Sequence, residues 1–263
     1  MALYGRLAAA RIRSDWQYRT SFLTVLASQA MVMVFEFLGV VFVLQLVPDL
    51  GGWTPTEVAF MYALATVPFG IADLLISSVE KTADHVQQGT FDRILLRPQP
   101  ALFQLSANDF QLRRIGKVVP SSAVLVWAVL NVDVDWTLGR IGVFVMAIVC
   151  GVVIYGSLWV ATASVSFWAV ASREAMNSVT YGGQSANEYP LHLYRNWIRA
   201  TLGWGIPLAF VSYVPTQWLL DAENPLGLSD RLILATPAVA AAMAALALVI
   251  WTIGIRHYQS TGS

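Results

Sequence analysis

The run Ile141–Ala171 reads IGVFVMAIVCGVVIYGSLWVATASVSFWAVA and contains no charged residue. A helix needs ~20 predominantly apolar residues to cross the ~30 Å hydrocarbon core of a bilayer, and this run exceeds that length. The whole chain of 263 residues has the same character, because 57% of its residues are hydrophobic and only 12% are charged. Since a soluble domain carries ~25% charged residues, the composition predicts a membrane protein.

Five more segments resemble this run in their apolar character. With it they give six expected membrane-spanning helices, at about 22–47, 58–79, 116–135, 141–171, 199–220 and 232–255. The segment at 116–135 has the shortest apolar core, and Pro120 lies near its start. We count it as a span because leaving it out would reverse the side of every later connection.

The basic residues fall unevenly on the connections between these segments. Fourteen of the sixteen Lys and Arg residues lie on one alternating set, and only Arg140 and Arg231 lie on the other. The positive-inside rule assigns the basic set to the cytoplasm. The sequence therefore predicts an all-α polytopic protein of the plasma (inner) membrane, with six transmembrane helices in a single domain, 1–263, and both termini in the cytoplasm.

Residues 1–20 have the pattern of an amphipathic helix at the cytoplasmic face. Leu3 and Leu7 share one side with apolar character, Arg6 and Arg13 share another, and Trp16 suits the head-group zone. Such a helix either has a role of its own or simply anchors the first span. The balanced charge of the chain gives no reason to expect nucleic acid as a partner.

Enzyme chemistry and cofactor binding have little support in the sequence. His85, His192 and His257 are far apart, and no His-Glu-x-x-His or Gly-x-Ser-x-Gly motif occurs. The Gly116–Lys117 pair lacks the preceding glycine of a phosphate-binding loop. We therefore expect a non-catalytic chain with no catalytic residue, no metal site and no cofactor of its own.

The second cytoplasmic connection contains a short amphipathic helix within the segment 84–98. Phe91 and Leu96 give it apolar character beside Asp92, Arg93 and Arg97. Gly89 permits a turn before this helix, and the residue before Pro98 is biased away from helix. A short helix at this place either docks on a soluble partner or lies against the bilayer and the neighbouring loops.

The run Gly89-Thr-Phe-Asp-Arg-Ile-Leu-Leu-Arg-Pro98 resembles the cytoplasmic Gly-x-hydrophobic-Asp-x-x-Leu-x-x-Pro segment of type-2 ATP-binding-cassette (ABC) export permeases. A second run, from Tyr189-Pro190 through Arg199 to Ile206-Pro-Leu-Ala-Phe210, is similar to the start of the fifth span in that family. The order and placement of the motifs, together with the chain length and the six expected spans, extend the resemblance over essentially the whole chain.

The resemblance implies a transmembrane permease subunit of an exporter that works in a pair, with a second permease chain of the same or a related kind. A separate ABC ATPase subunit would bind ATP and Mg²⁺ and drive the pair. The segment 84–98 then corresponds to the coupling helix. The positions carried over as contacts for the ATPase are Gly89, Phe91, Asp92, Arg93, Leu96 and Arg97.

Glu36 and Asp73 are the two ionisable residues that fall within the apolar stretches of the expected spans, away from the span ends. A charge at the centre of a bilayer costs ~2.5–3.5 kcal/mol on insertion scales. Glu36 therefore either lines a pathway or subunit interface or is a protonated hydrogen-bonding group. Asp73 lies nearer the cytoplasmic end, which favours a structural role.

The expected fifth span is interrupted by Pro207 and Pro215, with aromatic residues around them. It is either a kinked continuous span or, as the resemblance implies for 215–225, leads into short re-entrant helices. Pro207, Phe210 and Tyr213 are candidates for lining a pathway or interface.

Two other functions remain open on the sequence. An ion-coupled secondary transporter would use the intramembrane carboxylates and would usually show interrupted helices in both halves of the chain. A membrane-embedded enzyme would need convergent polar groups at one depth, for which only Glu36 and Asp73 are available.

Overall fold

The computed structural model describes residues 19–46, 52–108, 114–169, 173–222 and 224–259. Within these ranges every regular element is a helix. The interfacial helix expected at 1–20 lies outside the described residues, except for its last two.

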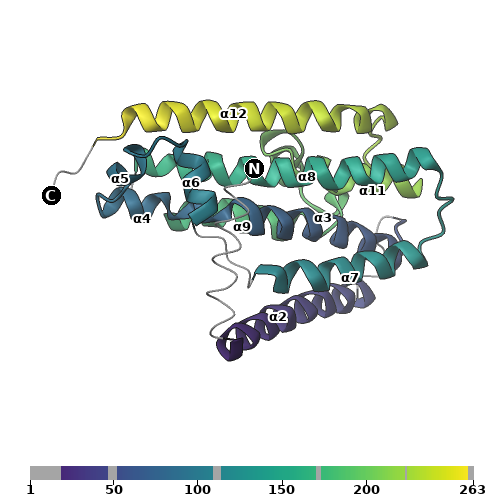
Figure 1. The fold of residues 1–263 in the computed structure, drawn as a ribbon. Coiled ribbons are helices and arrows are strands. Elements are labelled where there is room, and N and C mark those ends of the chain that lie inside the picture. The colour runs from purple at the N-terminus through teal and green to yellow at the C-terminus, as the bar shows by residue number, and fades with distance from the viewer. Residues whose placement is uncertain (1–18, 47–51, 109–113, 170–172, 223, 260–263) are drawn as a thin grey trace.

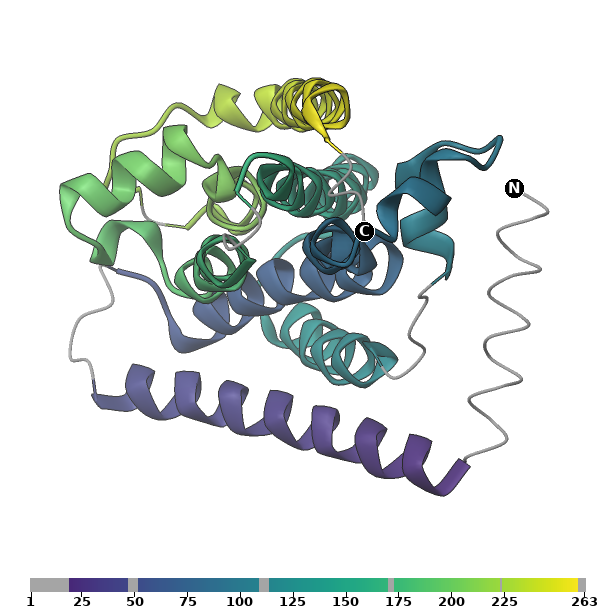
Figure 2. The ribbon, with the colours of Figure 1, turned by 90° about the vertical axis from the view of Figure 1, so that its left-hand side faces the viewer.

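A layer of long helices forms the body of the molecule (Figure 1). The helices α3 (Pro55–Ile76), α8 (Leu138–Ser164) and α12 (Thr236–His257) lie side by side, with α8 packed between the other two. On the other face of α3 lies α7 (Ile115–Asn131), and α2 (Arg19–Leu46) packs mainly against α7 at the edge of the bundle (Figure 2). These five helices occupy five of the six segments expected from the sequence.

Among the described residues, three helical stretches are long and apolar enough to cross a membrane, namely Pro55–Gln87, Leu138–Phe167 and Asp230–His257. Shorter apolar helices cover Leu23–Gly39, Ile115–Asn131 and Leu208–Leu220. Several apolar helices of this kind support a location in a membrane.

Side-chain caps fix the starts of α3 and α8 at the same end of the bundle. The Thr54 hydroxyl accepts a hydrogen bond from the Glu57 backbone N–H at 3.3 Å, and the Glu57 carboxylate accepts one from the Thr54 N–H at 2.6 Å. This reciprocal pair is a capping box. The Thr137 hydroxyl likewise accepts a hydrogen bond from the Arg140 N–H at 3.3 Å.

The opposite end of the bundle carries the connections that the charge pattern assigns to the cytoplasm (Figure 1). It holds α4 (Thr82–Gln87), α5 (Phe91–Leu95) and α6 (Ala101–Asn108), and α12 ends there. We call it the basic end, because it also includes the basic residues at the start of α7. The end where α3 and α8 begin is called the acidic end.

The expected fifth span, 199–220, is not one helix. It is divided into α10 (Asn196–Ala200), the π-helical η6 (Thr201–Gly205), the 3₁₀-helical η7 (Leu208–Phe210) and α11 (Tyr213–Leu220). Pro207 lacks a backbone N–H and biases the residue before it towards extended backbone, and Ile206 has φ −120° and ψ 99°. The helix therefore breaks at this point rather than bending.

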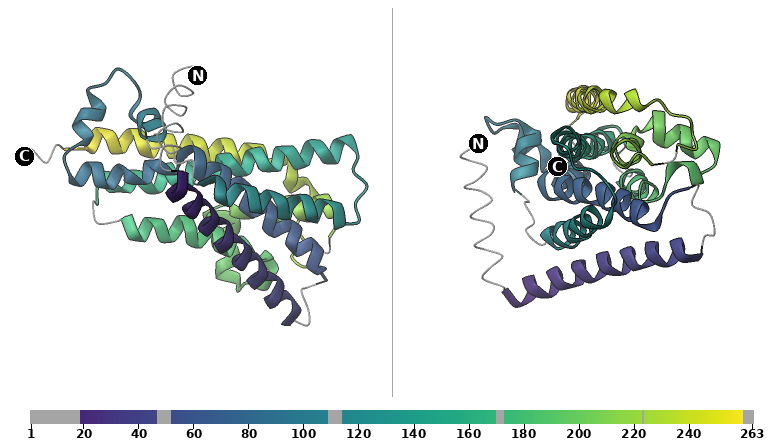
Figure 3. Two further views of the ribbon diagram at one scale, coloured as in Figure 1. Left: turned by 60° about the horizontal axis from the view of Figure 1, so that its bottom comes forward. Right: turned by 90° about the vertical axis from the view of Figure 1, so that its right-hand side faces the viewer.

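An additional helix, α9 (Arg173–Ala186), precedes this broken region and packs on α8. It begins at the basic end and points towards the acidic end (Figure 3). Its path continues in α11, since Ser212, directly before α11, donates a hydrogen bond to the Asn187 carbonyl at 3.2 Å. Residues 188–211 form an excursion between these two helices.

This arrangement corrects the sequence-based position of Arg195 and Arg199, which were expected at the basic end. The Arg199 guanidinium donates hydrogen bonds to the Tyr194 and His192 carbonyls. The His192 ring lies 5.6 Å from the ring of Trp53, two residues before α3. These arginines therefore lie towards the acidic end, because α9 has already carried the chain away from the basic end.

Candidate functional site

A tight turn joins α4 to α5 at the basic end. Gly89 has φ 64°, a conformation that favours glycine over residues with a Cβ. The Thr90 N–H donates to the His85 carbonyl at 2.9 Å, and the Thr90 hydroxyl lies 2.8 Å from His85 Nδ1. The turn therefore holds α4 and α5 in a fixed relation to each other.

Phe91 anchors α5 in the helix bundle. Its side chain is fully buried, and its ring centroid lies 5.2 Å from that of Phe167 and 5.1 Å from that of Tyr258. Phe167 in turn lies 5.3 Å from Trp251 of α12. These four aromatic residues, the aromatic anchor, join α5 to both α12 and the end of α8.

The far side of the segment 84–98 is exposed at the tip of the molecule. Leu96 has 85% of its surface exposed, and Arg93 and Arg97 are also exposed. Gln104 of α6 stabilises this tip from behind, because its amide donates to the Ile94 carbonyl at 2.9 Å and to the Gln99 carbonyl at 2.7 Å. An exposed leucine between two arginines is a surface suited to a protein partner.

Asp92 lies between the anchor and the exposed tip, at the base of α5. Burial and the nearby Asp92 carboxylate raise the pKa of the Tyr258 hydroxyl. Tyr258 therefore stays protonated at neutral pH. Of the predicted contact residues, Phe91 belongs to the anchor, Gly89 shapes the turn, and Arg93, Leu96 and Arg97 form the exposed tip.

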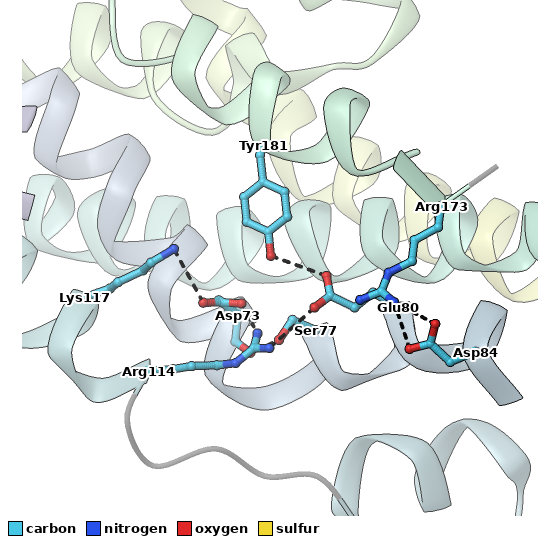
Figure 4. A network of polar contacts seen from close by, with 8 residues as sticks. All are labelled: Asp73, Ser77, Glu80, Asp84, Arg114, Lys117, Arg173 and Tyr181. Carbon is cyan, nitrogen blue, oxygen red and sulfur yellow. Dashed lines mark hydrogen bonds and ion pairs between the residues drawn. The ribbon is translucent and has the colours of Figure 1, made fainter. Parts of the chain in front are cut away.

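A network of charged side chains lies behind the segment 84–98 (Figure 4). Arg114, before α7, forms an ion pair with Asp73 of α3 and approaches Glu80 to 3.6 Å. The Lys117 ammonium lies 4.0 Å from the second Asp73 oxygen. The Asp73 side chain is only 3% exposed. The two cations therefore compensate its charge inside the protein, where water does so little.

The same network reaches α9. The Tyr181 hydroxyl donates to the Glu80 carboxylate at 3.3 Å, and Arg173 donates to both Asp84 oxygens at 2.6 and 2.8 Å. α9 is thereby joined to the stretch that leads into α5. A displacement of the tip would reach α9 through these contacts and α12 through the aromatic anchor.

Sequence reasoning missed this network, apart from Asp73. A usable signal was present, because Asp73, Ser77, Glu80 and Asp84 recur at intervals of four, three and four residues. That spacing places them on one face of a helix. A polar stripe leaving the end of an apolar span predicts buried partners, although it does not identify them.

Glu36 lines a cavity of about 170 Å³ between α2, α3, α7 and α9. Lys117, Tyr181 and Gln184 are among the other lining residues. Glu36 is itself exposed. Where the structure describes side chains, no group of three His, Cys, Asp or Glu is placed to hold a metal ion.

The remaining candidates from the sequence do not line this cavity. Phe210 and Tyr213 are buried, and the Tyr213 ring stacks on that of Trp53 at 5.3 Å with an interplanar angle of 7°. Pro207 marks the helix break described above. In this structure Phe210, in the excursion, and Tyr213, at the start of α11, are therefore packing residues.

Comparison with protein families gives a match to the model of the ABC-2 family transporter protein over residues 30–262. Searches of curated proteins and of solved structures found no match. The match spans the segment 84–98, the charged network and all helices from within α2 to α12. The chain therefore belongs to the ABC-2 transporter family and is a membrane component of an ABC transporter.

Proposed function

We propose that this chain is the permease subunit of an ABC exporter in the inner membrane, with a separate ATPase bound at the segment 84–98. ATP and Mg²⁺ would bind to the ATPase, and this chain would form the translocation pathway with a second permease chain. The observation that carries the proposal is the exposed tip around Leu96, held to the bundle by the buried Phe91.

The two faces of α5 suit the transmission of force. Closure of an ATPase pair on ATP would push on Arg93, Leu96 and Arg97. The buried Phe91 would pass the movement to Phe167, and so to the helices on either side. The permease pair would then alternate between two discrete arrangements, as proteins with moving domains or subunits commonly do.

A second permease chain has a suitable surface in α2. Met31, Phe35, Leu38 and Phe42 are exposed along this helix, and α7 covers one side of it. Glu36 lies among them, and a carboxylate at this depth is better placed against protein or water than against lipid. We therefore place the interface of the pair on the side of α2.

The proposal is tested by purifying the tagged chain in mild detergent and looking for a co-purifying ATPase with a phosphate-binding loop. We expect Leu96→Asp to lower its recovery at least tenfold, because a charge would replace the apolar centre of the contact. Leu138→Asp is the matched control, since Leu138 is 87% exposed at the other end of the molecule. Equal recovery with both variants would place the ATPase elsewhere.

Coupling is tested in the same complex after reconstitution into vesicles. Changing Asp92 and Arg93 together, to Asn and Gln, should separate ATP hydrolysis from transport while membrane insertion stays intact. Unchanged stimulation of ATP hydrolysis by substrate would remove these two residues from the coupling contact.

A further inference from the structure

The cavity beside Glu36 has the chemistry of a binding site. A cavity of ~150 Å³ holds a benzene-sized molecule, so this one, at about 170 Å³, has room for a small polar group. Four helices contribute to it, including α9, which the charged network joins to the coupling segment. A ligand here would therefore contact the elements that move in the proposed function.

The carboxylate of Glu36 lacks a compensating charge. It forms no hydrogen bond or ion pair with the rest of the described chain, although it lies near the middle of the apolar helix α2. An unpaired charge at this depth is costly, so a cationic partner would be favoured.

The other charges around the cavity do not balance the negative charge of Glu36. Arg114 and Lys117 balance Asp73 and Glu80 within the network. The Glu36 carboxylate is left over. The site therefore favours a cation over an anion or a neutral group.

The polar groups on the cavity wall are mainly available as hydrogen-bond acceptors. Thr66 uses its hydroxyl hydrogen on the Tyr62 carbonyl at 3.0 Å, which leaves an oxygen lone pair free. The Gln184 amide nitrogen donates to Glu188, which leaves the Gln184 carbonyl oxygen as an acceptor. With Glu36 and the Ser185 hydroxyl, which also lines the cavity, they offer acceptors to the three N–H donors of a primary ammonium.

Two further features fit an ammonium group. Phe69 and Tyr181 already hold the Lys117 ammonium over their ring faces, at 5.8 and 5.7 Å from the centroids, which is cation–π geometry. The hydroxyl of the buried Tyr62 has no hydrogen-bond partner among the described residues. Tyr62 lies one turn from Thr66 on the same face of α3 and interacts electrostatically with Glu36 and Glu188.

We propose that this cavity binds the primary ammonium group of an amphiphilic amine, with Glu36 as its counter-ion. The apolar part of the ligand would lie along α2, where Met33 also lines the cavity. This inference deepens the proposed function by naming a substrate class. Binding to the isolated chain needs no ATPase, so its failure is distinguishable from failure of the co-purification.

The test is isothermal titration of the full-length chain, in a nonionic detergent, with octylammonium. Octyltrimethylammonium, octanol and octanoate serve as probes of the same chain length. We expect octylammonium to bind most tightly, and Glu36→Gln to weaken its binding at least tenfold. Glu36→Asp, which keeps the charge, should retain most of the binding, and Glu174→Gln, an exposed carboxylate on α9 outside the cavity, should leave it unchanged.

The Lys117→Gln variant tests whether the ligand carries a positive or a negative charge. Removal of this neighbouring positive charge should strengthen octylammonium binding, whereas an anionic or zwitterionic ligand would bind more weakly. Weaker octylammonium binding to Lys117→Gln would overturn the proposal, as would equal binding to the wild type and Glu36→Gln. Octyltrimethylammonium binding as tightly as octylammonium would overturn the assignment of a primary amine.

Discussion

Gly254 in α12 allows the closest approach in the aromatic anchor. A Cβ built at this position would lie 2.5 Å from Cδ2 of Phe167. Overpacking of this kind costs ~1–3 kcal/mol, more than the ~1 kcal/mol that alanine gains over glycine in a helix. We therefore expect Gly254→Ala to lower the thermal unfolding midpoint of the purified chain in detergent.

Gly142→Ala is the matched control for this prediction. Gly142 is also a helical glycine, but a Cβ there would meet nothing within 4 Å. Its midpoint should stay the same or rise slightly. A fall of the same size in both variants would mean that the glycines matter through the helix backbone rather than through Phe167.

Two residues of the segment 84–98 also show how much of the site the sequence predicts. The family pattern pointed to Phe91 and Leu96 alike, because both are apolar residues of one short helix. The structure separates them, with Phe91 fully buried and Leu96 85% exposed. That difference depends on Phe167 and Tyr258, which are distant in sequence and carry no local signal for Phe91.

Contacts between elements differ in strength according to burial. Asp73 and Arg114, which join α3 to α7, have side chains that are 3% and 13% exposed. Removing one partner of a buried pair costs ~3–5 kcal/mol, and without Arg114 the buried Asp73 carboxylate would keep the Lys117 ammonium, 4.0 Å away, as its remaining cation in the network. Asp84 and Arg173, which join α4 to α9, are 36% and 38% exposed, and an exposed pair contributes only ~0.2–1 kcal/mol.

We therefore expect Arg114→Gln to reduce the yield of folded, monodisperse chain severely and Arg173→Gln to change it little. Size-exclusion chromatography in detergent measures both, and Arg140→Gln, which breaks the exposed pair with Asp221 at the acidic end, is the control. In the ATPase complex, Arg173→Gln should nevertheless weaken coupling, since it removes one of the contacts that join α9 to the network and leaves the bond from Tyr181 to Glu80. A stable chain with Arg114→Gln would contradict the importance assigned to burial.

The longest element that sequence reasoning missed is α9. Five expected segments are occupied by helices because their apolar runs are uninterrupted, and hydropathy alone locates such runs. The α9 sequence, REAMNSVTYGGQSA, is mostly polar or small, so hydropathy does not mark it. Its position depends on partners such as Glu80 for Tyr181, and a single sequence does not reveal them.

At the scale of the whole molecule, the missed helix changes which end of the bundle Arg195 and Arg199 approach. The positive-inside rule is statistical, and it weighs every basic residue between two apparent spans equally. Arg199 instead stabilises the excursion by donating to two backbone carbonyls. Twelve of the sixteen basic residues still lie on the predicted cytoplasmic set, so the expected orientation of the chain does not depend on these two.

Single-cysteine labelling with a membrane-impermeant maleimide tests this arrangement. Leu138→Cys should react in intact cells, and Leu96→Cys only after permeabilisation, because the two residues lie at opposite ends of the bundle. The native Cys150 is buried within α8 and should stay unreactive.

The deciding position is Asn196, which is exposed at the start of α10. If α9 carries the chain towards the acidic end, Asn196→Cys reacts from outside like Leu138→Cys; reaction only after permeabilisation would restore the sequence-based position of this segment.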